Sequence, residues 1–418
     1  MRVQLTRALR TLALVAATLA TITPARAQEE PPPEPVTEPA EESPPTPALA
    51  PAPSPAAPLD ARASTQIAGY ADNDHVYVIS PTVAGALSNQ TAGWSVDARY
   101  LIDIVSAASV DIVSTASRRW EEVRQVGSLG GLYKPGNVGV GANADVSVEP
   151  DYQSYTFGAS VQQDLFSKNV TLLLGYDHAH DISGRARTPF SVFSHTIDHN
   201  GFKGGATFVL DKATLFSAVT DVILESGDTS KPYRYIPMFA PGTDVPRGAS
   251  VVLVDALRTP ARVLEQLPTK RGRYAASGHL AHRFARSTLR LSERLYTDSW
   301  GLSASSTDTR MLIDLTDRIE VGPHLRFHAQ TPVAFWQRAY VAAPNFDFPA
   351  LRTGDRELGP LMSVTGGGNL RIALGTAERL RAWVFGVDLN LTETRYLDDI
   401  YITSRLSAVG ALSLEAAF

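Results

Sequence analysis

The densest group of possible metal ligands in this sequence surrounds one polar loop. His178 and His180 precede the loop, and His195 and His199 follow it. Two histidines separated by one residue share a face of a β-strand, and imidazole together with carboxylate suits Zn²⁺, Cu²⁺ or Ni²⁺. The spacing marks these four histidines as candidate metal ligands. The alternative is a hydrophilic loop stem that is exposed to solvent.

A second set of charged residues occupies alternate positions in segments whose other positions are apolar. If these segments form the wall of a water-filled barrel, acidic and basic walls face each other across the lumen. Such walls can set an ion preference or orient polar solutes. The alternative is that the charges pair with one another and confer no selectivity. The candidate lumen residues are Asp97, Asp103, Asp145, Asp177 and Asp221 on the acidic side, Arg283, Arg290, Arg294, Arg310 and Arg326 on the basic side, and Asp388 on the expected strand 380–395. Arg99 and Lys203 are exceptions on the acidic side.

One carboxylate departs from this arrangement. Strict alternation from Leu291 and Leu295 directs Glu293 towards lipid, unless a β-bulge reverses the local assignment.

Enzymatic signatures are missing from the chain. It has no P-loop, no G-x-S-x-G, no H-E-x-x-H and no dinucleotide-binding glycine pattern placed between a strand and a helix. We therefore expect neither an enzyme nor a cofactor. No basic arm suggests nucleic-acid binding. The absence of cysteine excludes disulfides, thiolate metal sites and a lipoprotein anchor.

The elements that position these residues are β-strands with a period of two. The clearest example runs from Val138 to Val148, where every second residue is valine or alanine and the intervening residues are small or polar. An apolar face opposite a small or polar face is what lipid outside and water inside require. The expected strands are 63–71, 75–87, 92–104, 120–133, 137–149, 152–165, 169–181, 198–211, 213–226, 272–285, 288–299, 302–316, 320–335, 360–374, 380–395 and 404–418.

The connections between these strands alternate between short and long, which fits a bacterial outer-membrane barrel with short periplasmic turns and longer outer loops. The pattern predicts an all-β, antiparallel, up-and-down transmembrane barrel of about 16 strands, with 14 as the alternative. The chain ends in an apolar strand that closes on Phe418. Aromatic residues near strand ends are expected to form interfacial girdles: Trp94, Tyr100, Trp300, Trp336, Trp383 and Tyr396.

Two further segments precede the expected barrel at 63–418. Residues 1–27 read as a secretory signal peptide, with Arg2, Arg7 and Arg10 before a short apolar run and an A-x-A cleavage site ending at Ala27. Residues 28–62 are rich in proline and glutamate and are expected to form a disordered periplasmic spacer. The spacer is either a plain tether or a contact with the cell wall or a periplasmic protein.

The longest connection, from Gly227 to Gly272, is expected not to be structureless. It contains six prolines, so it should not form a regular central strand. It also contains two apolar clusters that should not stay exposed. We expect it to pack into or over the lumen and to narrow it beside the arginines. A cap that only shields the mouth is the alternative.

Three fragments resemble an uncharacterised bacterial family of about this length that is known only as a domain of unknown function. They are Asp103 to Arg124, Lys231 to Pro237, and Tyr296 to Thr309. The resemblance would cover residues 64–418. It implies a barrel-like envelope protein and brings no catalytic or binding residues.

The sequence therefore predicts a porin-like channel of the bacterial outer membrane for small polar solutes or ions. Its expected partners are outer-membrane lipid, these solutes and the barrel assembly machinery. The alternative is a non-conducting barrel that serves as an adhesin, a loop-display scaffold or a barrel enzyme.

Overall fold

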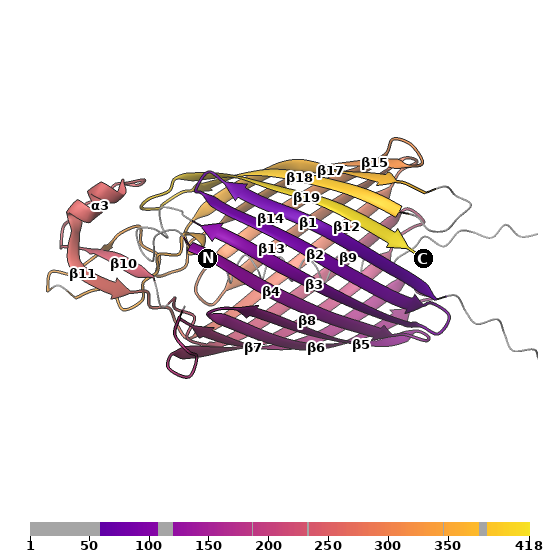
Figure 1. Ribbon diagram of the computed structural model, residues 1–418, viewed down its shortest axis with the longest axis horizontal. Helices are drawn as coiled ribbons and strands as arrows, with labels where there is room; N and C mark the ends of the chain where they lie inside the picture. The colour runs from indigo at the N-terminus through magenta and orange to yellow at the C-terminus, as the bar shows by residue number, and fades with distance from the viewer. Residues whose placement is uncertain (1–58, 108–119, 186, 232–233, 346, 376–382) are drawn as a thin grey trace, which may run out of the picture. The chain divides into compact units, whose positions relative to one another are not determined.

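Sixteen antiparallel strands form a closed barrel (Figure 1). The structure is a computed structural model that describes residues 59–107, 120–185, 187–231, 234–345, 347–375 and 383–418. The expected signal peptide and nearly all of the expected spacer lie outside these residues. The barrel strands are β1 (Asp60–Asp72), β2 (Val76–Asn89), β3 (Trp94–Ala107), β4 (Trp120–Tyr133), β5 (Val138–Glu149), β6 (Tyr152–Leu165), β7 (Val170–Gly184), β8 (Ser194–Val209), β9 (Thr214–Gly227), β12 (Lys270–Arg283), β13 (Ser287–Asp298), β14 (Ser303–Asp314), β15 (Ile319–Gln330), β17 (Leu361–Ala373), β18 (Trp383–Tyr396) and β19 (Ser404–Ala417).

The predicted strand count of sixteen is confirmed, and fourteen is wrong. Each predicted strand overlaps an observed one. The largest error is at the end of β15, which stops at Gln330 and not at residue 335. Pro332 follows and has no N–H to donate to a ladder, so pairing ends there.

The barrel closes because its first and last strands pair. β1 is hydrogen-bonded to β2 on one side and to β19 on the other, with Gly69 opposite Gly410. An unpaired backbone N–H or C=O costs several kcal/mol in hydrocarbon, so a sheet edge is not stable against lipid. Closure removes both edges.

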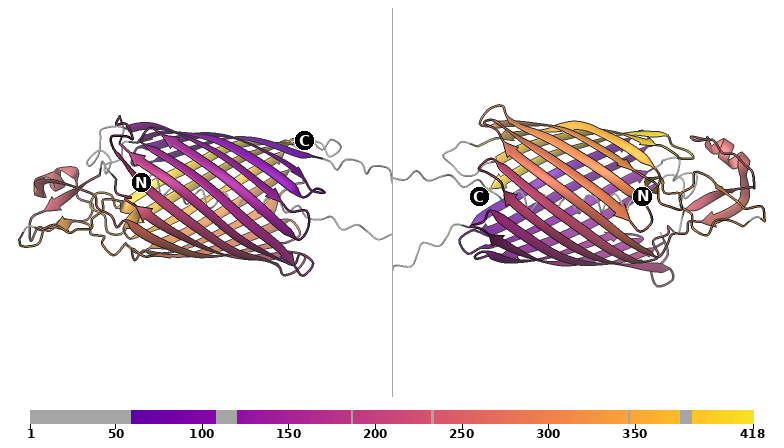
Figure 2. Two further views of the ribbon diagram at one scale, coloured as in Figure 1. Left: turned by 90° about the horizontal axis from the view of Figure 1, so that it is seen from below. Right: turned by 180° about the vertical axis from the view of Figure 1, so that it is seen from behind.

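The long connections at one end of the barrel fold into a cap, which we define as residues 228–269 and 331–360 as far as they are described. It contains β10 (Tyr235–Phe239), α3 (Val251–Leu257), β11 (Arg258–Leu264), β16 (Tyr340–Val341) and the 3₁₀ turn η1 (Arg356–Leu358). β10 lies between β11 and β16 in a three-stranded sheet. Figures 1 and 2 show β10, β11 and α3 beyond the ends of the barrel strands, at the end opposite the C-terminus.

The cap has its own small cores. Phe239, Val245, Ala249 and Val254 form one of them, and residues Ile400 and Tyr401 from the β18–β19 loop pack against it. The backbone N–H of Ala249 also donates to the carbonyl of Ile400 at 2.7 Å. Ile236, Met238 and Phe239 of the first apolar cluster are therefore covered within the cap and do not enter the lumen. Of the second cluster only Val254 is buried, and Val252 stays 79% exposed.

The expectation that the Gly227 to Gly272 segment narrows the lumen beside the arginines is wrong. Its anchoring hydrogen bonds run to the other connections at the same end, as between Gln266 and Arg352, whose backbones exchange hydrogen bonds of 3.0 Å. It is an outer cap. Pro237 does lie in a central strand, but the pairing of β10 with β11 shifts register directly after it, and β16 pairs only from Met238 onward.

The aromatic girdle is only partly observed. Trp94, Tyr100 and Trp383 lie on the outer face by strand alternation. Trp300 and Tyr396 are instead 5% and 1% exposed at the capped end, and Trp336 packs in the cluster around Trp300.

No helix in the described part of the chain is long and apolar enough to cross a membrane.

Candidate functional site

The structure places all eleven candidate lumen residues on the inner face of the barrel wall. The pairing register fixes this face. Asp177 lies opposite Gly201 on β8, while the adjacent Tyr176 and Phe202 meet on the outer face with ring centroids 5.3 Å apart. The same alternation around the barrel puts leucine, valine, isoleucine and phenylalanine on the outside of nearly every strand.

A row of alternating polar and glycine residues runs across six inner-wall positions. In order from β3 to β8, it contains Asp97, Gly130, Asn143, Gly158, Asp177 and Gly201. Each polar side chain lies across the glycine of the next strand. A Cβ built on Gly130 would be 2.8 Å from Asp97 Oδ1, and one on Gly158 or Gly201 would approach the side chain of Asn143 or Asp177 even more closely. The glycines thus allow the polar groups to lie flat against the wall.

Replacement of Gly130 by alanine should therefore narrow the lumen. The added methyl group would meet the carboxylate of Asp97, which must then move away from the wall. We expect a lower single-channel conductance in a barrel that still folds. Gly175→Ala is the matched control, because Gly175 also faces inward on β7 and a Cβ there meets nothing closer than 3.6 Å. Equal conductance in both variants would contradict the role assigned to the glycine row.

The acidic candidates are only partly ion-paired. Asp103 pairs with Arg124, and Asp221 pairs with Arg294 at 3.0 Å. Among the described residues, the other acidic candidates have no ion pair within 4.0 Å: Asp97, Asp145, Asp177 and Asp388. The alternative that all of these charges pair with one another therefore does not describe the acidic wall.

The basic candidates divide in the same way. Arg283 pairs with Asp314, and Arg310 lies 3.5 Å from Asp308. Within the described parts of the chain, Arg290 and Arg326 have no carboxylate within 4.0 Å. Asp308 and His324 were not anticipated from the sequence, although they occupy the same alternating positions and are 2.8 Å apart.

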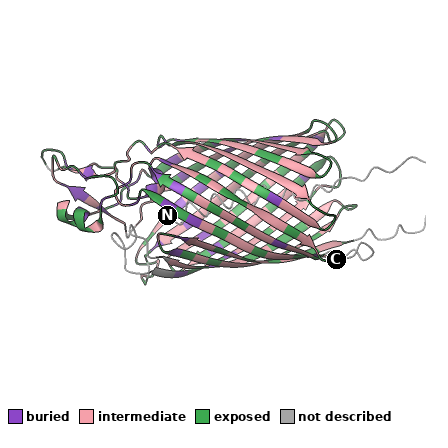
Figure 3. Cartoon of the chain, turned by 90° about the horizontal axis from the view of Figure 1, so that it is seen from above, coloured by how far each residue is buried: buried purple, intermediate pink, exposed green. Residues whose placement is uncertain are grey.

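Inward-facing side chains are more exposed in the middle of the barrel than at its capped end. Val409 faces inward yet is 41% exposed, and the Arg310 side chain is 40% exposed. Near the cap, the side chains of Asp298, Glu225 and Asp181 are at most 3% exposed. Figure 3 shows buried residues gathered at that end, with alternating exposure along the rest of the strands.

Ion pairs hold the cap against the barrel mouth. Arg356 of η1 is 2% exposed and pairs with Asp74 of the β1–β2 turn at 3.1 Å. Glu357 accepts a hydrogen bond from the Tyr396 hydroxyl at 3.1 Å and lies 3.4 Å from Arg405. This segment therefore crosses the mouth on the side formed by β18, β19 and β1.

The four candidate histidines do not come together. His178 and His180 share a face as predicted, but it is the outer face, where His180 lies 2.7 Å from Asp198. His199 faces inward between Asp181 and Glu225, 3.0 Å from each, and His195 is on the same inner face. The register of the β7–β8 hairpin pairs even-numbered residues with even-numbered ones, so the two pairs of histidines lie on opposite sides of the wall. The single four-histidine site is wrong.

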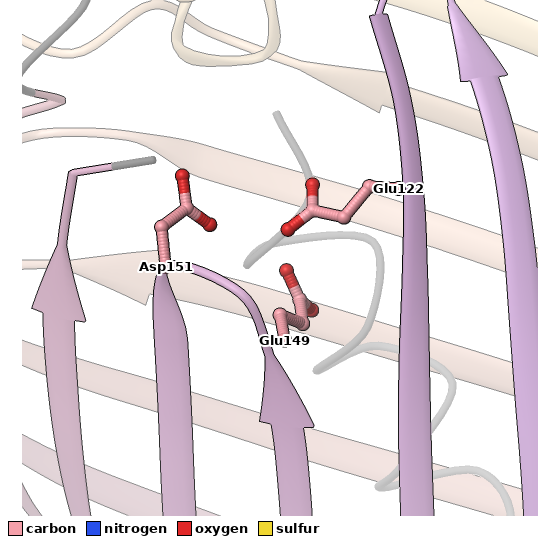
Figure 4. A group of neighbouring side chains, drawn as sticks. All are labelled: Glu122, Glu149 and Asp151. Atoms are coloured by element: carbon pink, nitrogen blue, oxygen red, sulfur yellow. The ribbon is translucent and has the colours of Figure 1, made fainter. Parts of the chain in front are cut away.

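The described residues instead gather three carboxylates that the sequence did not suggest. Glu122, Glu149 and Asp151 each place an oxygen within 4.8 Å of the others at the capped ends of β4, β5 and β6 (Figure 4). Oxygen-only donors suit hard cations such as Ca²⁺. Arg124 Nε lies 4.0 Å from Glu149 and balances part of this charge.

Glu293 faces outward in the middle of β13, as strict alternation requires. The β13–β14 pairing has no register shift, so no bulge reverses it. Its carboxylate accepts hydrogen bonds from Ser305 at 2.7 Å and Thr307 at 2.5 Å, both on the outer face of β14.

The cap should loosen in acid. Asp355 is buried, and its ionised carboxylate pairs with Arg234 at 3.3 Å and accepts the backbone N–H of Glu357. Protonation removes this ion pair, so the stability that it contributes is present above the usual carboxyl pKa of about 3.9 and is lost as the pH falls below that value. Hydrogen exchange should show weaker protection of η1 and β10 at pH 3 than at pH 7. Asp355→Asn should reduce this difference, and an unchanged difference would exclude Asp355 as its source.

A family model described as "Protein of unknown function (DUF3570)" matches residues 119–384, which is more than half of the chain. The chain belongs to the DUF3570 family. The resemblance found in the sequence is confirmed, although the match is shorter than the expected 64–418. Comparison with curated proteins gives no match.

Among solved structures, this DUF3570 member is similar to three outer-membrane proteins. One is a bacterial polysaccharide outer membrane secretin, at 8% identity and a TM-score of 0.44, covering 87% of this chain and all of that one. Another is OccD3 (OpdP) of Pseudomonas aeruginosa, at 8% identity and a TM-score of 0.43, covering 86% and 90%. The third is OpdK of the same organism, at 6% identity and a TM-score of 0.40, covering 86% and 99%.

Proposed function

We propose that this DUF3570 barrel is a channel of the bacterial outer membrane for small polar solutes or ions. The observation that carries the proposal is the contrast between the two faces of the wall. The outer face is apolar, as lipid requires, whereas the inner face carries charged side chains that remain solvent-exposed in the middle of the barrel. A wall of this kind surrounds water.

Membrane location is the first part of the proposal to test. The intact protein should fractionate with the outer membrane, and its folded barrel should contact outer-membrane lipid through the apolar face. Recovery of the intact, folded chain in the soluble periplasmic fraction would overturn the proposal.

Conductance of purified protein in planar bilayers tests the channel itself. The full chain should give discrete ionic currents. A variant in which residues 234–266 are replaced by a short Gly/Ser linker should also conduct, because this segment lies at the mouth and does not enter the lumen. The absence of current in both proteins, with the barrel folded, would exclude a channel. Current in the deletion variant alone would instead favour a non-conducting barrel that displays its cap.

A further inference from the structure

Two arginines face each other directly across neighbouring strands of the inner wall. Arg290 on β13 is the register partner of Arg310 on β14, and both side chains point into the lumen. Like charges placed directly opposite each other in a sheet are destabilising. This pair therefore needs compensation from a carboxylate or from a bound anion.

The protein supplies little of that compensation. Asp308 is 3.5 Å from Arg310, but it also pairs with His324 at 2.8 Å. Arg326 is the register partner of Asp308 and adds a third guanidinium to the same area. In the part of the chain that the structure describes, no carboxylate lies within 4.0 Å of Arg290 or Arg326. This patch of three arginines thus has one nearby carboxylate.

The arginines on either side of this patch are different, because each has its own acid. Arg283 pairs with Asp314, and Arg294 pairs with Asp221 at 3.0 Å. The neighbouring polar groups of the wall are also engaged: Thr288 accepts from Arg283 at 3.1 Å, and Ser292 is hydrogen-bonded to His279 at 2.9 Å. In the wall from β12 to β15, excess positive charge is therefore local to Arg290, Arg310 and Arg326.

The guanidinium groups of this patch are accessible from the lumen. Arg290 is exposed, and the Arg310 side chain is 40% exposed. A guanidinium binds the oxygens of carboxylate or phosphate through two parallel N–H donors, and two adjacent guanidiniums can hold one oxyanion between them.

We infer that Arg290 and Arg310, supported by Arg326, form an oxyanion-binding subsite on the lumen wall. The inference rests on the proposed channel function and specifies it further: the permeating solutes include small molecules with a carboxylate or phosphate group. Asp97, Asp145 and Asp177 on the opposing wall repel an anion, although Arg99 and Lys203 on the same face offset part of this charge.

The test is block of the chloride current by inorganic phosphate or by succinate at constant ionic strength. Each should reduce the wild-type current to a saturating limit. Arg290→Gln with Arg310→Gln should weaken the apparent affinity at least tenfold, and Arg290→Lys with Arg310→Lys should restore part of it. Block by succinate alone would show that the subsite binds carboxylates, and block by phosphate alone would show that it binds phosphates.

The control is Arg283→Gln with Arg371→Gln, which removes the same charge from arginines that already have acids, Asp314 and Glu415. It should leave the block unchanged. A wild-type current that neither anion saturates, or equal losses in the two double variants, would overturn the subsite while leaving the channel intact. A wild-type protein with no current would instead refute the channel.

Discussion

Replacement of Arg271 by alanine is expected to destabilise the barrel by about 3–5 kcal/mol, because it leaves a buried carboxylate without its cation. The Asp298 side chain is 0% exposed and pairs with Arg271, which also lies 4.2 Å above the Trp300 ring. Asp298 fixes the β13–β14 turn as well, by accepting the backbone N–H groups of Trp300 and Leu302 at 2.9 and 3.0 Å. The change should therefore loosen β12, β13 and β14 at the capped end of the barrel.

Urea unfolding of the protein in lipid vesicles measures this effect. The matched control is Arg395→Ala, which breaks a pair with Glu393 whose members are 63% and 51% exposed. Exposed pairs contribute about 0–1 kcal/mol. A similar loss in both variants would show that the buried pair has no special role.

The second large effect is expected from the same substitution made on opposite faces of the wall. Leu389 on β18 faces outward and is 55% exposed, whereas Val409 on β19 faces inward and is 41% exposed. Leu389→Arg should cost about 2–4 kcal/mol, because it places a charge in hydrocarbon. Val409→Arg should cost much less, because the new side chain enters water.

The measurement is again unfolding in vesicles, with both variants compared with the wild type. The two positions are one residue apart in register on adjacent strands, since Asn390 next to Leu389 pairs with Val409. The two positions therefore lie at closely matched depth on neighbouring strands. A smaller cost for Leu389→Arg than for Val409→Arg would show that the inner and outer faces are assigned the wrong way round.

The wall could be predicted from the sequence because its signal is local. In a strand, the face on which a side chain lies depends only on whether its position is odd or even. The sequence alone therefore shows that Asp145 and Val146 lie on opposite faces. Tight turns such as 134–137 add a second local signal. The strand boundaries and the outward position of Glu293 followed from these signals alone.

The cap and the histidines could not be predicted, because they depend on non-local pairing. Met238 pairs with Tyr340, about one hundred residues later, and no periodicity links the two. For the histidines, the pairing of His180 on β7 with Asp198 on β8 determines which residues of β8 face inward. A one-residue change in register would move His199 to the other face. The glycine row could not be recognised in the sequence either, because the polar partner of each glycine is determined only by the register.

Closure of the barrel also dictates the order of folding. β1 needs β19 as its neighbour, so the first strand of the wall must wait for the last one. Pairings so distant in sequence form slowly, and until they form the sheet has two open edges that can pair with other chains. An unclosed chain thus risks aggregation at both ends at once. Shielding those two edges is the task that a barrel assembly partner would have to perform for this protein.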